Sequence, residues 1–148
     1  MENDKYKEQF AILSNNLDIF TKKIRKKKST LMATDIWTVK DVLCHIVFWH
    51  ESYAANYRAL AENLEPPLLN GPGYKLNTDG VASLQKYSIP ELIDRLGKAQ
   101  NSLYVSIVEK GVPKMTYKKD GHIYTTPEFL DVIARHLATH TKHVRRAR

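Results

Sequence analysis

Apolar side chains recur every three or four residues along much of the chain, which is the spacing of one face of an α-helix. The first such stretch covers residues 8–27, with apolar side chains at Phe10, Leu13, Leu17, Phe20 and Ile24. A second helix is predicted from Thr38, where Asp41 completes an N-terminal capping arrangement, to about residue 64. This second stretch is apolar on more than one face, so we expect it to lie in the middle of the packing.

A cluster of helix-breaking residues follows the second helix. Residues 65–87 contain three prolines and three glycines, which predicts a connection of about 23 residues without another long helix. A third helix is predicted over residues 88–111, because a capping serine and a first-turn proline open it and a glycine ends it. Residues 112–125 could form a loop or a weak hairpin. The fourth helix is predicted to start at Thr126 and Pro127 and to run toward the end of the chain.

The lengths of the connections select one arrangement of these four helices. Amphipathic helices of roughly 20 residues bury their apolar faces most simply in a four-helix bundle, so the predicted fold class is all-α. The short first link makes helices one and two antiparallel, whereas the long crossover lets helices two and three run parallel. We therefore predict an up-down-down-up bundle with a long crossover between helices two and three.

Composition narrows the class of protein. The chain has 148 residues, 43% of them hydrophobic and 26% charged, which excludes collagen-like, low-complexity and disulfide-scaffold proteins and fits one domain over residues 1–148. No apolar run approaches the ~20 residues that span a bilayer, and the first five residues lack the apolar segment of a signal peptide. The single cysteine, Cys44, forms no internal disulfide. We therefore expect a cytoplasmic protein with no membrane association.

The net charge of +7 comes from two short segments. Residues 22–28 carry six positive charges, and four more belong to Lys142, Arg145, Arg146 and Arg148. The remaining residues carry 13 basic and 16 acidic side chains, so the positive charge does not spread over a groove-sized face. Cations at helix C-termini are stabilised by the helix dipole, and the same residues could also attract an anionic substrate.

Three of the six histidines have positions that suit one metal site. His136 and His140 are one helical turn apart and continue the apolar stripe of the fourth helix, so they should point inward together. His45 lies ~10 Å along the second helix, and His140 lies ~8 Å from the end of the fourth. The predicted topology brings these two helix ends to the same pole, so His45, His136 and His140 can converge. Three histidines leave one coordination position of a divalent cation open.

Other interpretations of the histidines and the cysteine stay open at this stage. An inward-facing histidine pair is often only a hydrogen-bonded core pair. His50 and His122 are interpreted as structural or surface residues, and Cys44 as buried packing. His143 is interpreted as a terminal cation favoured by the helix dipole, and it could also serve as a substitute ligand.

The segment from Trp37 to His50, Trp-Thr-Val-Lys-Asp-Val-Leu-Cys-His-Ile-Val-Phe-Trp-His, and the later pair His136-x-x-x-His140 resemble the DinB/YfiT-like superfamily of metalloenzymes. Two further segments, Pro72-Gly-Tyr-Lys-Leu-Asn77 and Tyr87-Ser-Ile-Pro-Glu-Leu92, look closer to its ClbS/DfsB branch. The likeness extends from about residue 8 to residue 143. Members of that branch commonly lack the full histidine triad, which this sequence keeps.

The resemblance implies a specific fold and cofactor. It implies an up-down-down-up bundle, frequently dimeric, that holds one divalent metal ion per chain, zinc or nickel, on His45, His136 and His140. Known activities in the superfamily include thiol-dependent transferases and isomerases, and ClbS-like members protect against a reactive genotoxin. It therefore favours a metal-dependent hydrolase or thiol-dependent transferase that acts on a small molecule.

The sequence identifies pocket walls more readily than a catalytic base. Trp49, Tyr53 and Tyr57 continue one stripe of the second helix and are predicted to line a substrate pocket, although aromatic residues at this spacing are more often core. Glu51 and Asp41 are the nearby carboxylates, but the sequence shows no partner residues around either that would mark a catalytic acid–base site.

Two further function classes are compatible with the sequence. The first is a protein that binds a small reactive molecule without catalysis, as in genotoxin protection of the ClbS/DfsB type. The second is a nucleic-acid binder that uses the basic segments, but the sequence has no helix-turn-helix, zinc-finger or aromatic RNA-binding motif. A small-molecule ligand and a homodimer are therefore the predicted partners, and nucleic acid is disfavoured.

Overall fold

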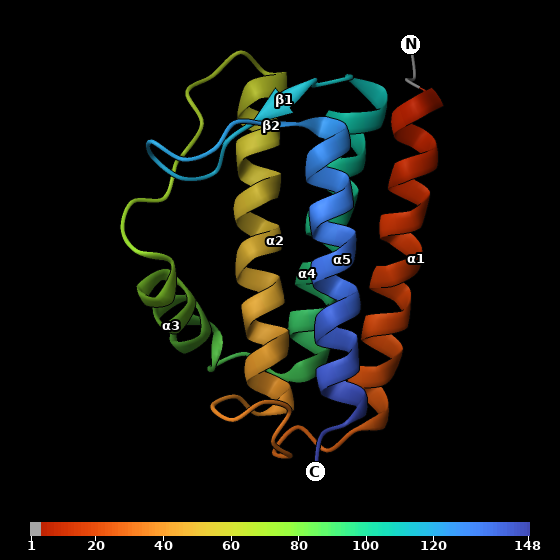
Figure 1. The fold of residues 1–148 in the computed structure, drawn as a ribbon, viewed down its shortest axis with the longest axis vertical. Helices are drawn as coiled ribbons and strands as arrows, with labels where there is room; N and C mark the ends of the chain where they lie inside the picture. The colour runs from red at the N-terminus through yellow and green to blue at the C-terminus, as the bar shows by residue number, and fades with distance from the viewer. Residues whose placement is uncertain (1–3) are drawn as a thin grey trace.

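The computed structural model describes residues 4–148, so residues 1–3 of the predicted domain lie outside the described part. Four long helices form a bundle (Figure 1). Their bounds are α1 Asp4–Lys26, α2 Val39–Ala61, α4 Ile89–Tyr104 and α5 Thr126–Arg145. A shorter helix, α3, covers Gly73–Leu84 and lies beside the bundle. None of the described helices is long and apolar enough to cross a membrane.

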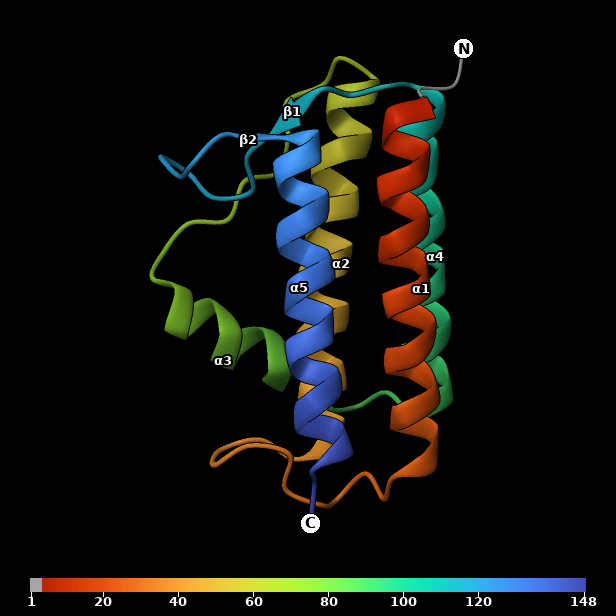
Figure 2. The same cartoon turned by 45° about the vertical axis from the view of Figure 1, so that its right-hand side comes forward.

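The predicted up-down-down-up topology is confirmed. Helices α1 and α5 run from the pole where α1 begins to the opposite pole, whereas α2 and α4 run the other way (Figures 1 and 2). Helix α1 packs mainly on α5, and α2 packs mainly on α4, so the closest neighbours are parallel pairs. The long crossover between α2 and α4 makes this arrangement possible.

Helix starts follow the capping residues of the sequence. Thr38 caps α2 and Ser88 caps α4, and in each case the side chain three residues later bonds back to the cap. Helix α5 has the same capping box, but its cap is Thr125, one residue before the predicted start. These caps satisfy backbone N–H groups that a helix leaves without partners, which explains why the predicted starts hold to within one residue.

The crossover contains a helix that the sequence analysis did not predict. Pro72 stands in extended backbone as the N-cap of α3, and the helix then continues for 12 residues. Gly80 does not break this helix. A Cβ at Gly80 would lie 2.5 Å from Cγ of Phe48, so the glycine allows α3 to pack directly against α2. The sequence predicts a connection of about 23 residues without another long helix, and α3 is a shorter helix that this prediction did not include.

The segment between α4 and α5 is a hairpin rather than a loop. Helix α4 continues as one π-helical stretch over Val105–Glu109, and Gly111 ends it with a φ of +66°. Strands β1 (Lys114–Met115) and β2 (Tyr124–Thr125) then pair antiparallel. The loop between these strands is tied to the crossover, because the N–H of Leu69 donates to the carbonyl of Tyr117 at 3.0 Å. The ring of Tyr117 packs on Trp49 and Tyr53 of α2, at centroid distances of 5.4 and 5.2 Å.

The two basic segments lie together at one pole. Helices α1 and α5 both end there, and Nζ of Lys27 donates to the carbonyl of Ala147 at 3.3 Å. The backbones of Met32 and Arg148 pair with each other at 3.1 and 3.2 Å. This pole is also where α2 begins, so α1, α2 and α5 share it.

Candidate metal centre

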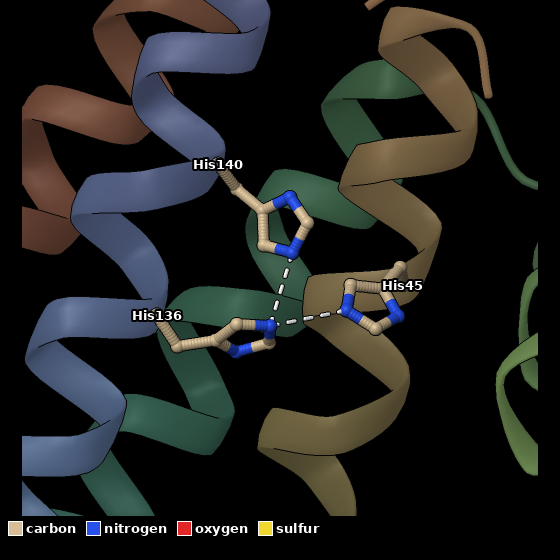
Figure 3. A group of neighbouring side chains, drawn as sticks. All are labelled: His45, His136 and His140. Atoms are coloured by element: carbon tan, nitrogen blue, oxygen red, sulfur yellow. Dashed lines mark hydrogen bonds between the residues drawn. The ribbon is translucent and has the colours of Figure 1, made fainter. Parts of the chain in front are cut away.

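Three histidine rings from two helices meet inside the bundle. His45 comes from α2, whereas His136 and His140 come from successive turns of α5, and all three rings point toward one another (Figure 3). The Nε2 atoms of His45 and His136 are 3.3 Å apart, and those of His136 and His140 are 3.0 Å apart. The up-down-down-up topology produces this meeting, because α2 begins and α5 ends at the same pole.

The spacing of these nitrogens suits a small cation. Two nitrogens bound to one tetrahedral zinc ion at ~2.0–2.1 Å lie ~3.3 Å apart. One ligand atom from each of His45, His136 and His140 lies within 4.8 Å of the other two, so the three side chains could hold a metal ion. All three offer nitrogen, which is a donor that zinc and nickel accept. The residues present therefore fit a divalent metal ion.

The surroundings keep these rings neutral. Burial, together with a smaller contribution from the nearby His136, lowers the pKa of His45 to about 3. Burial also lowers the pKa of His140 to about 3, with smaller contributions from the three neighbouring histidines. The pKa of His136 is lowered by the same cause. At neutral pH each ring therefore has one free lone pair, which is the form that binds a metal.

The outer nitrogens of the triad have unequal surroundings. Nδ1 of His140 lies 3.3 Å from Nδ1 of His143, a half-buried residue three positions further along α5. Nδ1 of His45 is buried without a hydrogen-bond partner in the described part of the chain, and the ring of Trp37 lies 4.6 Å away, centroid to centroid. Metal-binding histidines usually donate their outer N–H to a neighbour, so the protein supplies this support for His140 but not for His45.

A cavity of about 480 Å³ opens beside the triad. It is lined by His45, Trp49, Tyr53, Asn77, Tyr117, Val132, Ile133, Arg135, His136 and Thr139. Nε1 of Trp49 donates to Oδ1 of Asn77 at 2.7 Å, which links α2 to α3 across the cavity wall. Its volume is within the range of small-molecule sites, and its walls are mostly aromatic and apolar with a few polar groups, which is typical of them.

Tyr57, the third predicted wall, does not line this cavity. It lies one helical turn beyond Tyr53, where its side chain is fully buried against the start of α5. Its ring packs on Phe129 at 5.2 Å, and its hydroxyl group lies 3.0 Å from Oγ1 of Thr126. The stripe of α2 that carries Trp49 and Tyr53 enters the core at Tyr57, so Tyr57 is a packing residue.

Four polar or aromatic cavity residues were not predicted from the sequence. Asn77 lies on the unpredicted helix α3, and Tyr117 reaches the cavity from the hairpin loop. Arg135 and Thr139 each directly precede one histidine of the pair on α5, and this adjacency in the sequence is the signal that could have identified them as cavity residues. Arg135 pairs with Asp131 at 2.8 Å on the exposed side of the helix.

The two carboxylates near the triad in sequence lie outside the cavity. Glu51 accepts two hydrogen bonds from Arg95, at 2.6 and 2.8 Å, on another face of α2. Asp41 accepts from the backbone N–H of Thr38 and from the side chain of Gln85. No carboxylate of the described residues lines the cavity, so a general base of this type is missing from its walls.

The remaining singled-out residues have structural or surface positions. His50 is buried and shares a 2.7 Å hydrogen bond with Oε1 of Gln100. His122 is exposed and lies 3.5 Å from Glu128. Cys44 is buried, and burial raises the pKa of its thiol to about 11, so it stays protonated. The basic residues at 22–28 and 142–148 do not line the cavity.

Comparison with known proteins adds the fold and little else. No protein-family model and no curated protein matches the chain. Solved structures of a mycothiol-dependent maleylpyruvate isomerase and of its histidine-to-alanine mutant match with a TM-score of 0.74 at 11% identity. The match covers 94% of this chain but only 60% of the isomerase chain. The likeness shows a shared helical bundle fold, and membership of the DinB/YfiT-like superfamily and of its ClbS/DfsB branch stays a prediction.

Proposed function

We propose that this protein is a metal-dependent enzyme that acts on a small molecule through a site formed by His45, His136 and His140. One observation carries the proposal. Three neutral imidazoles converge with Nε2 separations of 3.0 and 3.3 Å, and two of them, His45 and His136, line a 480 Å³ cavity. A divalent ion, zinc or nickel, would suit this donor set, with one ion per chain.

When bound, such an ion supplies Lewis acidity that lowers the pKa of a water molecule or of a small thiol. The chain's own residues would bind and orient the substrate. Trp49, Tyr53 and Tyr117 offer aromatic surface, and the N–H of Trp49 is already bonded to Asn77. Burial raises the pKa of Tyr53, and it raises that of Tyr117 to about 12. Both hydroxyl groups are therefore protonated at neutral pH and can donate hydrogen bonds to a substrate.

Two reaction classes fit this site, hydrolysis and thiol-dependent transfer. The absence of a carboxylate from the described cavity walls favours a reaction that needs no separate general base. Thiol transfer depends less on such a base than hydrolysis does, because a free thiol with a pKa of about 8.5 ionises far more readily than water. The name of the structural neighbour, a mycothiol-dependent isomerase, supports this choice for the present chain.

The same missing carboxylate supports a second candidate function. A cavity with aromatic walls and no acid-base pair can also hold a reactive molecule without converting it, as in the genotoxin-protection proteins of ClbS/DfsB type. The two functions differ in turnover. A metal-loaded enzyme would consume electrophile in the presence of a small thiol, in amounts that exceed the protein. A binder would stop after one equivalent.

Metal analysis tests the proposal directly. We expect protein purified without a histidine tag to contain, or to take up, about one zinc or nickel ion per chain. His136→Ala should lose this ion, whereas the control His122→Ala should keep it, because His122 is exposed and remote from the triad. Equal metal content in the two variants, or no uptake by the wild type, would contradict the proposal. Sedimentation of the same samples would test the homodimer that the family resemblance implies.

A further inference from the structure

We propose that His143 is a positioning residue that holds the proton of His140 on Nδ1 and so leaves the Nε2 lone pair of His140 directed into the metal centre. This inference rests on the proposed function, since it assigns a role relative to that site. It replaces the interpretation of His143 as a terminal cation.

The geometry places the two rings in direct contact. His143 follows His140 by three residues on α5, which sets their side chains on neighbouring positions of one helix face. Their Nδ1 atoms are 3.3 Å apart, and their ring planes meet at 69°. His143 is half-buried, so its ring is held against the helix bundle rather than free in solvent. One of the two Nδ1 atoms must donate this hydrogen bond and the other must accept it.

The position of a single proton decides whether His140 can bind a metal. A neutral imidazole has one N–H, and Nε2 of His140 lies 3.0 Å from Nε2 of His136. With the proton on Nε2, His140 would donate to His136 and block its own lone pair. With the proton on Nδ1, His140 donates to His143, and Nε2 faces the centre with a free lone pair. An acceptor at Nδ1 of His143 therefore selects the tautomer that a metal needs.

His45 is a histidine of the triad that lacks such a partner. Nδ1 of His45 is buried and unbonded in the part of the chain that the structure describes. His143 therefore gives His140 a support that the ring on α2 does not have. The expected result is that His140 is the better oriented of these two ligands.

Two substitutions separate a hydrogen-bonding role from a packing role. His143→Asn keeps an acceptor, because Oδ1 of asparagine is bonded to Cγ just as Nδ1 of histidine is. His143→Phe keeps a ring of similar size but has no acceptor. We expect His143→Phe to weaken zinc binding ~10–100-fold, the usual effect of losing such a partner, and His143→Asn to stay close to the wild type. The dissociation constant would be measured by competition with a chromophoric chelator.

The proton itself can be observed without any metal. The ¹⁵N shifts of His140 in metal-free protein report which ring nitrogen carries the proton. We expect Nδ1–H in the wild type and in His143→Asn, and a shift toward Nε2–H in His143→Phe. Circular dichroism of each variant would verify that the bundle is folded.

The outcomes distinguish this inference from the proposed function. If the wild type takes up no zinc, the proposed function fails, but the ¹⁵N shifts still decide the role of His143. If the wild type binds zinc and His143→Phe binds equally well, or if the tautomer of His140 does not respond to His143→Phe, the inference is overturned. Equal weakening in His143→Asn and His143→Phe would also overturn it, since packing would then explain both.

Discussion

Replacing Gly80 by alanine tests how α3 is held over the cavity. An added Cβ would lie 2.5, 2.6 and 2.8 Å from three ring carbons of Phe48, whereas nonbonded carbons normally stay ~3.5–4.0 Å apart. The closest of these atoms is Cγ, which a rotation of the ring about the Cβ–Cγ bond leaves in place, so only a change of the Phe48 χ1 rotamer or a shift of α3 relieves the contact. If Phe48 keeps its rotamer, helix α3 moves away from α2 by roughly 1 Å.

The expected stability change follows from two opposing contributions. Replacing a glycine by alanine inside a helix normally gains about 0.5–1 kcal/mol. Overpacking against a neighbour typically costs ~1–3 kcal/mol. Gly97 supplies the matched control, since it lies inside α4 and a Cβ there would meet nothing within 4 Å. We expect Gly97→Ala to stabilise the fold and Gly80→Ala to be less stable than Gly97→Ala by ~1–3 kcal/mol.

Urea unfolding of both variants would measure this difference, and ligand or metal binding would measure its effect on the site. The hydrogen bond from Trp49 to Asn77 is 2.7 Å long, so a shift of α3 by roughly 1 Å would break it or force a rearrangement of the cavity wall. If Gly80→Ala and Gly97→Ala stabilise the protein equally, then α3 does not pack on Phe48 as described, and the reasoning is wrong.

Three further predictions follow from the structure. Burial lowers the pKa of His50 to about 4, so its contribution to the unfolding free energy is fully present above the unfolded-state pKa of about 6.5 and is lost as the pH falls toward 4. We expect urea unfolding at pH 7 and pH 5 to show this loss of stability, and we expect the loss to be smaller in His50→Gln. Tyr57→Phe removes a hydroxyl group bonded to Thr126 and should cost ~1 kcal/mol in unfolding free energy without changing metal affinity. A marked loss of metal affinity would show that Tyr57 contributes to the site. Zinc at 100 times its dissociation constant should stabilise the wild type by ~2.7 kcal/mol, and a chelator should remove this gain, whereas His136→Ala should respond to neither addition.

Much of the bundle could be predicted from local signals. The apolar spacing and the capping residues Thr38 and Ser88 are local, and they locate the long helices. Helix α3 was missed because its evidence is not local. Gly80 looks like a helix breaker in the sequence, and only its contact with Phe48 shows why a glycine stands there.

The residues of the candidate site also fall into two groups, those that the sequence could predict and those that it could not. The meeting of His45 with the pair on α5 could be derived from helical spacing together with topology, because both depend on regular geometry. Asn77 and Tyr117 could not be derived, since each reaches the cavity through a segment whose path depends on tertiary contacts. Tyr57 shares the periodicity of Tyr53, and only the start of α5 packed on Tyr57 distinguishes a core position from a wall.

The most direct measurement is the anomalous scattering of a crystal grown with zinc and recorded on both sides of the zinc absorption edge. We expect one strong peak per chain, ~2.0–2.1 Å from the Nε2 atoms of His45, His136 and His140. Density for zinc only at surface histidines such as His122, with the three inner rings free of it, would contradict the central claim that the bundle holds a metal ion.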